Sequence, residues 1–325
     1  MQLDLFIPQS RFPQVLQSGA DSVLAGLLAK ARLTRVAEGM EMLLCRQAVA
    51  GMDAGDALSL AAIAYCGEDW AENGPVFDSS RVLFADPVHL QLQRDCFTLS
   101  APVPLPLSAD EASALLDGLN GHFADDGMQF AAGTSGHWYL QVAAMPAVST
   151  QSPDRAMDRD IHAFLPAGPD AARWQHLGNE IQMLLHAHPV NQQREARGLP
   201  ACNSLWFWGG GQPPQAGNGR TLFAYGDSPL VKGLARLGHV TYKGAAPAAA
   251  DMHGQVPISW WLDDASAVDS GLQLVADALS RGKLRGLRLY LAGRGEALQA
   301  DLSWSDLLKF WRRRRVVQFY FAERA

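Results

Sequence analysis

The sequence has few cysteines, and none of them is placed for a disulfide framework or a metal site. Cys45, Cys66, Cys96 and Cys202 are scattered over 325 residues without a C-x-x-C pair or a nearby histidine pair. This spacing indicates reduced, partly buried thiols and argues against a zinc site. Apolar runs are also short, well below the roughly 18 residues of a membrane-spanning helix. We therefore expect no metal and no membrane partner.

The sequence also lacks the features of a secretion signal and an excess of positive charge. The N-terminus, MQLDLFIPQSRF, has neither a basic start nor a long apolar core, which predicts a cytoplasmic protein instead of a secreted one. Excess positive charge is absent too: the net charge is −6, so nucleic-acid binding, which needs a basic face, is not expected. With 48% hydrophobic and 18% charged residues, the composition predicts a globular protein with a sizeable core.

The order of the expected elements predicts an α/β fold. After residue 220, apolar strand patterns alternate with helical patterns, which favours a mixed, mostly parallel sheet with helices on both faces. A strand at Leu3–Ile7 would join the same sheet. We predict a discontinuous sheet domain from residues 1–77 and 216–325, with residues 78–215 inserted as an α+β cap domain.

Several local patterns can be checked individually. Ser108 and Glu111 predict a capping box at the start of a helix, and residues 129–132 and 137–142 predict a hairpin. Residues 81–85 and 88–92 are expected as two strands around a turn. Residues 309–315 are predicted to end a helix, with a strand following at 316–321.

One segment, Asn179 to Gly211, concentrates polar side chains, aromatic residues and glycines. It predicts the end of a helix stopped by Pro189, then a polar elbow, then a strand that ends on glycines. The elbow is either an anion or sugar-phosphate pocket or a hinge whose polar groups bond each other. The residues alone leave both interpretations open. The candidate ligand-binding residues are His188, Asn191, Arg194, Asn203, Trp206, Trp208, Gly209, Gly210 and Gly211.

Weaker candidates lie outside the elbow. Asp86 and His89 either bind a ligand or, as we favour, belong to a turn that Asp86 fixes. Glu180 lies on the polar face of the expected helix. Trp206 and Trp208 alternate along their strand, so they share one face, where core packing is commoner than a ligand-stacking wall.

This segment also carries a resemblance. HPVNQQREARGLPACNSLWFWGGG resembles a block of the archaeal-type cofactor-independent phosphoglycerate mutases, members of the alkaline phosphatase superfamily. ADPVHL, NEIQMLLHAHPVN and NSLWFWGGG resemble the bacterial RpfE-type proteins, which regulate pathogenicity factors. The first resemblance implies an alkaline-phosphatase-like fold. The second implies virulence regulation but no mechanism.

The mutase resemblance also implies a metal centre and a serine nucleophile, which this chain does not match. Gly55 stands at the serine position before Asp56, Gln9 follows the first strand instead of an acidic ligand, and no Asp-His pair occurs around Arg294. Two-metal phosphoryl transfer needs several carboxylate and imidazole ligands. We therefore expect a non-catalytic protein without cofactor that binds a phosphorylated metabolite or a regulatory protein partner in an interdomain cleft.

Two alternatives remain open. A divergent metal-dependent phosphoglycerate mutase would have rebuilt its centre from Asp263, Asp264, Asp269 and His253. A nucleic-acid-associated protein would use the basic run 312–315.

Overall fold

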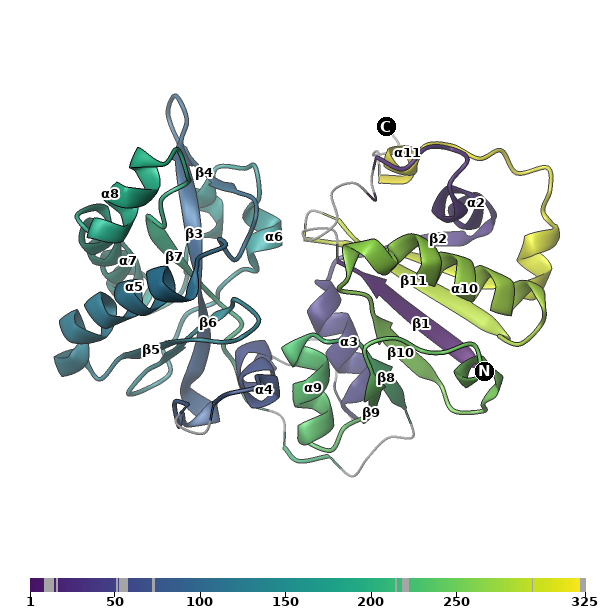
Figure 1. Cartoon of the computed structure of the whole chain (residues 1–325), viewed down its shortest axis with the longest axis horizontal. Coiled ribbons are helices and arrows are strands. Elements are labelled where there is room, and N and C mark those ends of the chain that lie inside the picture. Colours follow the sequence, from purple (N-terminus) through teal and green to yellow (C-terminus); the bar gives the residue numbers. More distant parts are fainter. Residues whose placement is uncertain are drawn as a thin grey trace. The chain divides into compact units, whose positions relative to one another are not determined.

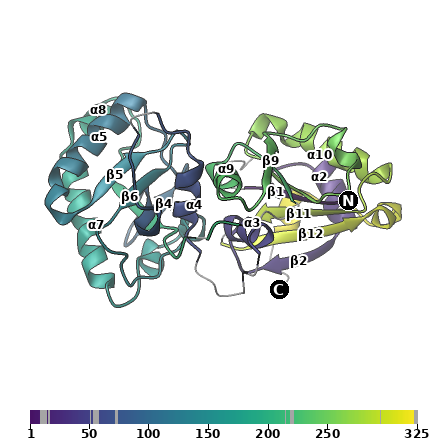
Figure 2. The same cartoon turned by 90° about the horizontal axis from the view of Figure 1, so that it is seen from below.

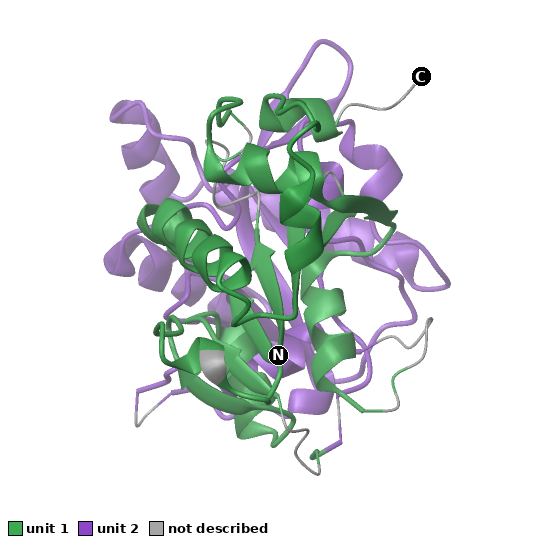
Figure 3. Ribbon diagram, turned by 90° about the vertical axis from the view of Figure 1, so that its right-hand side faces the viewer, with its two compact units in different colours: residues 1–53, 216–325 green, residues 54–215 purple. Residues whose placement is uncertain are grey.

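The computed structural model describes residues 1–8, 15, 17–50, 52, 58–71, 74–213, 215–217, 222–293 and 295–321. Gln9, Gly55, Asp56 and Arg294, on which the mutase comparison depends, lie outside these ranges. The chain forms two compact units, residues 1–53 with 216–325 and residues 54–215 (Figure 3). Residues 54–77, assigned from sequence to the sheet domain, thus group with the second unit.

The first unit is an α/β unit with a mixed sheet. Its strands are β1 (Gln2–Ile7), β2 (Arg32–Val36), β8 (Phe223–Tyr225), β9 (Thr241–Gly244), β10 (Ile258–Trp261), β11 (Gly286–Ala292) and β12 (Ala297–Ser303). Within the described residues their order is β2-β12-β11-β1-β10-β8-β9 (Figure 1). The strands from β11 to β9 pair in parallel, and β12 and β2 are antiparallel. The predicted mixed, mostly parallel sheet is confirmed.

Helices cover both faces of this sheet because its strands are apolar on both sides. Along β1, Leu3 and Leu5 pack in a core with α2 (Val23–Lys30) and α10 (Val268–Ser280). Phe6 points to the opposite face, where it stacks on Tyr290 with ring centroids 4.5 Å apart. Gln47 of α3 (Met40–Ala48) donates to the Tyr290 hydroxyl at 3.0 Å, and α9 (Pro229–Arg236) packs beside α3 (Figure 2).

The second unit contains a five-stranded antiparallel sheet over its described residues. Its strands are β3 (Val82–Leu92), β4 (Phe97–Ser100), β5 (Gln129–Ala132), β6 (Trp138–Gln141) and β7 (Ser204–Trp208). The long β3 pairs with β4, β6 and β7. Two strands around a turn at Asp86 were expected. That expectation is wrong, because β7 pairs with residues 84–88 and keeps β3 continuous.

The helices of the second unit lie mostly on one face of its sheet. They are α4 (Leu60–Gly67), α5 (Ala109–His122), α6 (Pro153–Ala156), α7 (Ala171–His186) and α8 (Pro189–Ala196). Residues of α5 and α7 form one core with β3, β6 and β7. The Ser108–Glu111 capping box and the β5–β6 hairpin are confirmed.

Short elements complete the description. The 3-10 helices are Ser79–Arg81, Ala124–Asp126, Ile161–Phe164, Asp251–His253, Ala265–Ala267 and Trp304–Leu308. α11 (Val317–Phe321) occupies the position where a strand was predicted, and the residues before it are irregular instead of helical. Both predictions there are wrong. Over the described ranges, no helix has the length and apolar character needed to cross a membrane.

Candidate functional site

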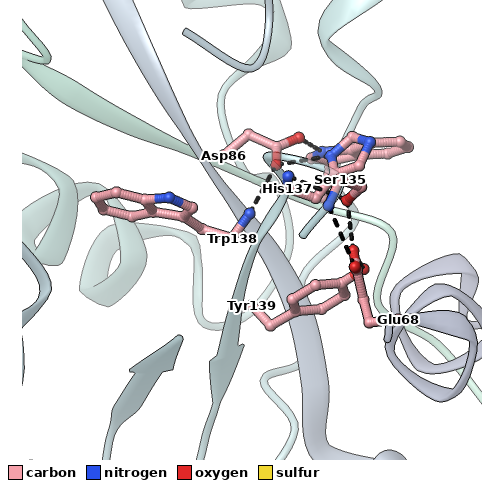
Figure 4. A network of polar contacts seen from close by, with 7 residues as sticks. Glu68, Asp86, Ser135, His137, Trp138 and Tyr139 are labelled. Atoms are coloured by element: carbon pink, nitrogen blue, oxygen red, sulfur yellow. Dashed lines mark hydrogen bonds and ion pairs between the residues drawn. The ribbon is translucent and has the colours of Figure 1, made fainter. Parts of the chain in front are cut away.

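A buried aspartate is the first centre of a polar network in the second unit (Figure 4). The side chain of Asp86 on β3 is fully buried. Its carboxylate accepts hydrogen bonds from the Trp138 backbone N–H at 3.3 Å and from Trp208 Nε1 at 2.8 Å. His137 Nδ1 lies 2.9 Å from the same carboxylate and completes three donors around it. Burial of the carboxylate is thereby offset by charge-assisted hydrogen bonds.

A buried glutamate is the second centre. Glu68, directly after α4, is 2% exposed. Its carboxylate accepts from the Thr134 hydroxyl at 2.9 Å, from the Ser135 backbone N–H at 3.2 Å, from the Ser135 hydroxyl, and from the Tyr139 hydroxyl at 2.9 Å. Desolvation, followed by the charge of Glu68, raises the pKa of Tyr139 well above 10.0. The phenol therefore stays protonated and keeps donating.

Strand alternation brings these groups together. On β3, Phe84 and Asp86 share one sheet face, while Leu83 and Ala85 belong to the core with α5 and α7. Phe84 stacks on Trp208 with ring centroids 4.5 Å apart and lies 4.8 Å from the His137 ring. The network thus lies on the sheet face that α5 and α7 do not cover, within a group of aromatic rings.

Gly133 permits the close approach of Glu68 to the hairpin loop. A Cβ on Gly133 would collide with Glu68 Oε1 and would come within 2.9 Å of Tyr139 Cε2. Only glycine lets the carboxylate reach both Ser135 and Tyr139. Gly133, in the loop between the two hairpin strands, therefore makes room for the Glu68 carboxylate.

His137 contributes a partly exposed imidazole to the network. Asp86 offers only acceptor oxygens to its three partners, so Nδ1 carries the proton and donates. The His137 side chain is 17% exposed, and its Nε2 has no partner among the described residues and is not buried. This ring nitrogen can accept a proton or, once protonated, donate to an anion.

Ser135 does not form a nucleophilic dyad with this histidine. Its hydroxyl donates to Glu68 and accepts from the His137 backbone N–H at 3.3 Å. A serine nucleophile would instead donate to the imidazole. The arrangement orients an imidazole towards solvent and supplies no activated hydroxyl.

Four of the residues predicted for an anion pocket are engaged in internal hydrogen bonds. Asn191 bridges the Leu185 carbonyl and both backbone groups of Cys202, at 2.7–2.8 Å. Asn203 holds the backbone of Leu90 through a pair of bonds at 2.7 and 2.8 Å. His188 caps α8 by accepting a hydrogen bond from the Val190 backbone N–H at 3.3 Å, and Arg194 pairs with Glu111. These side chains therefore tie backbone segments of the second unit to one another.

The expected irregular elbow after Pro189 is wrong. Proline lacks an N–H and fits the first turn of a helix, where no bond is lost. Pro189 therefore ends α7 and starts α8, and extended His188 becomes the N-cap between them.

The other predicted residues fall into two groups. Asp86 and Trp208 belong to the network. Gly209 follows β7 with φ of +68°, and a Cβ at this position would lie 2.7 Å from Phe84 Cδ2, so glycine allows the chain to pack closely against Phe84. Trp206 donates to the Gln151 carbonyl at 2.8 Å, so both tryptophans are packed side chains. The remaining candidates lie apart: His89 contacts the Ala201 carbonyl, Glu180 pairs with His122, and Gly210 packs against Leu83 before Gly211. Asp86 fixes no turn, because it lies within β3.

Sequence reasoning missed Glu68, Ser135, His137 and Tyr139. The signal that was available is the alternation Ser135-x-His137-x-Tyr139, which places three polar side chains on one side of an extended segment.

Arg194 forms a buried ion pair that makes the stability of the second unit depend on pH. Its Nη1 lies 2.7 Å from Glu111 Oε2. Burial tends to raise the pKa of Glu111, but the Ser108 N–H and Arg194 outweigh it, and the pKa is lowered from 4.5. Because the pKa of Glu111 is lower in the folded than in the unfolded chain, the ionised carboxylate stabilises the folded state at pH values above the unfolded-state pKa. This contribution to stability is lost as pH falls through the folded-state pKa.

We expect Glu111→Gln to lower the free energy of unfolding by about 1.5–3 kcal/mol at pH 7, the range for hydrogen bonds to charged groups. The stabilities of both proteins from denaturant melts should converge as pH falls from about 4.5, the unfolded-state pKa, through the lower folded-state pKa of Glu111. The exposed Glu195→Gln is the control. A difference that persists unchanged at pH 2 would contradict the ion-pair explanation.

Acidic side chains at the carboxyl end of the parallel sheet bond to their neighbours. Asp264 accepts from the Ser266 N–H at 2.8 Å and hydroxyl at 2.7 Å, and so caps the following 3-10 helix. Asp263 accepts from the Asp227 N–H at 3.4 Å, and Asp269 lies in the first turn of α10. Over the described residues, no three His, Cys, Asp or Glu side chains form a group that could hold a metal ion. The described carboxylates do not fit the two-metal centre that the mutase resemblance implies.

Comparison with solved structures gives distant likenesses, among them the following two. The PH0037 protein from Pyrococcus horikoshii aligns over 93% of this chain and 87% of its own, with 12% identity and a TM-score of 0.46. The cofactor-independent phosphoglycerate mutase from Thermoplasma acidophilum aligns over 93% and 89%, with 12% identity and a TM-score of 0.36. Both scores are too low to support an argument about function.

Comparison with models of known protein families gives no match. Sequence comparison finds 29% identity over 111 residues to the 2,3-bisphosphoglycerate-independent phosphoglycerate mutase of Methanosarcina mazei, covering 34% of this chain and 28% of that protein. A probable mutase of the same name from Geobacter sulfurreducens is 30% identical over 111 residues, with the same coverage. The matched segment spans little more than a quarter of these relatives. About a third of the chain is therefore distantly similar in sequence to cofactor-independent phosphoglycerate mutases.

Proposed function

We propose that this chain is a non-catalytic protein, related to the phosphoglycerate mutase scaffold, that binds a small phosphorylated metabolite. The observation that carries the proposal is His137, whose Nε2 faces solvent while Asp86 holds Nδ1 at 2.9 Å. The Asp86 carboxylate holds the ring through Nδ1, and an Nε2–H group of this ring would donate to an anionic oxygen of a ligand. The mutase names of the relatives supply the ligand class, a phosphoglycerate.

The use of the other reactive groups supports binding over catalysis. The Ser135 hydroxyl donates to Glu68, and the Asp264 carboxylate caps a helix. Neither is positioned as a nucleophile or as a metal ligand. The proposal concerns the second unit by itself. A protein partner and a virulence-regulating role, as in RpfE-type proteins, remain predictions.

The test is a thermal-shift titration of the whole chain with 3-phosphoglycerate, with manganese present and after chelation. A ligand that binds only the folded state stabilises it by about 2.7 kcal/mol at 100 times its Kd. We expect a shift that survives chelation and is lost in His137→Gln. The control is His186→Gln, which changes an exposed histidine at the end of α7.

Other outcomes would separate the alternatives. A shift that requires manganese would support the divergent metal-dependent mutase. A shift that His137→Gln leaves unchanged would place the ligand elsewhere. The absence of a shift in both conditions would exclude 3-phosphoglycerate as a ligand and favour a protein partner.

A further inference from the structure

Aromatic and basic side chains are exposed together in one short segment of the first unit. Every residue from 310 to 316 is exposed. The exposed fractions of Phe310 and Trp311 are 87% and 65%, and four arginines, residues 312–315, follow directly. We call residues 310–316 the basic aromatic segment. Such grouping of large apolar side chains with cations is unusual on a surface and marks an interaction site.

Packed elements hold both ends of this segment. Before it, Asp306 closes a capping box with Ser303 and pairs with Lys309 at 2.6 Å. After it, Val317 is fully buried, and its N–H bonds to the Ser18 carbonyl at 3.3 Å. The segment is therefore a short connection between anchored ends, and its side chains project into solvent.

The cations of the segment are available to an anionic partner. In the part of the chain that the structure describes, no ion pair involves the guanidinium groups of residues 312–315. Arg315 instead lies over the Phe319 ring at 3.9 Å, and the Arg314 guanidinium packs near Gly26. The net charge of the whole chain is −6, so four adjacent arginines form a local concentration of positive charge.

The apolar side chains distinguish between anionic partners. The Phe310 and Trp311 rings meet edge to face, at 83° and 5.2 Å, which does not form a parallel platform for stacked nucleic-acid bases. Exposed aliphatic residues adjoin them: Leu308 is 56% and Val316 50% exposed. Single-strand-binding surfaces use mainly aromatic side chains for stacking, whereas the boundary between headgroups and acyl chains accepts aromatic and aliphatic side chains alike.

We propose that the basic aromatic segment docks this chain onto an anionic phospholipid surface. Phe310 and Trp311 enter the headgroup region while the arginines contact lipid phosphates and carboxylates. The sequence expectation of no membrane partner rested on the lack of a spanning run, and a peripheral contact needs none. This inference is independent of the proposed metabolite binding.

The experiment is co-sedimentation of the whole chain with vesicles of phosphatidylcholine alone or mixed with phosphatidylserine. We expect binding only to the mixed vesicles, weakened by salt. Each of Arg312→Gln and Arg313→Gln should weaken binding about fivefold, as one basic residue near an anionic surface does. Arg285→Gln removes an exposed charge elsewhere and is the matched control.

A second variant tests the apolar contribution separately. Phe310→Ala with Trp311→Ala should reduce vesicle binding at least tenfold at constant charge. Because both side chains are largely exposed, thermal unfolding should match that of the unchanged protein. Equal sedimentation with neutral and anionic vesicles would overturn the proposal. Binding to single-stranded nucleic acid without binding to vesicles would overturn it too and assign the segment to that partner.

Discussion

Replacing Asp86 by alanine is expected to lower the free energy of unfolding by about 3–5 kcal/mol, because it breaks a buried hydrogen-bond network and leaves its donors without an acceptor. Three donors lose their acceptor at once: His137 Nδ1, the Trp138 N–H and the Trp208 indole N–H. Trp208 is 6% exposed, so its indole cannot recover the bond from bulk water. The variant also leaves a cavity.

The measurement is urea unfolding followed by tryptophan fluorescence, to which Trp138 and Trp208 contribute among the nine tryptophans of the chain. Asp117→Asn, on the exposed side of α5, is the control and should stay within about 0.5 kcal/mol. Asp86→Asn keeps the volume and one acceptor, so a smaller loss is expected. A change below 1 kcal/mol in Asp86→Ala would show that the network does not stabilise the unit.

In the first unit, replacing Gly226 by alanine should lower the free energy of unfolding by about 3 kcal/mol. Gly226 follows β8 with φ of +128°, which L-residues rarely adopt. An added Cβ would collide with the Trp261 carbonyl oxygen and lie 3.0 Å from the Trp261 Cβ. Trp261 belongs to a central strand, so its backbone cannot move aside without disturbing the sheet.

Gly244 supplies a matched control for this prediction. It has φ of +127°, and nothing lies within 4 Å of its virtual Cβ. Gly244→Ala therefore carries the backbone strain alone, which costs about 1–3 kcal/mol. Comparing denaturant midpoints of the two variants separates the collision from the strain. Equal losses would mean that the collision with Trp261 contributes nothing.

Local signals in the sequence were sufficient for much of the fold. The Ser108–Glu111 capping box needs only neighbours along the chain, and the β5–β6 hairpin needs partners a few residues apart. The mixed sheet of the first unit followed from alternating strand and helix patterns. Predictions failed where long-range packing decides. β3 is continuous because β7, more than 100 residues away, pairs across Asp86 and Pro87.

The candidate site shows the same limit. Asp86 and Trp208 were singled out, yet nothing in the sequence indicated that they bond each other. Asp86 and His137 are 51 residues apart, and Glu68 and Tyr139 are 71 apart. No local pattern encodes such pairs. The polar elbow was overinterpreted for the opposite reason: Asn191 and Asn203 bond backbone groups that the sequence does not display.

The insertion of the second unit into the first has a consequence for synthesis on the ribosome. β1, residues 2–7, lies between β10 and β11, residues 258–261 and 286–292. At about 5–20 residues per second, the nascent strand waits roughly 10–50 s for its neighbours. Residues 54–215 emerge complete before then. An apolar strand is thus left unpaired during translation, and chaperone capture of the growing chain should concentrate on its first 50 residues.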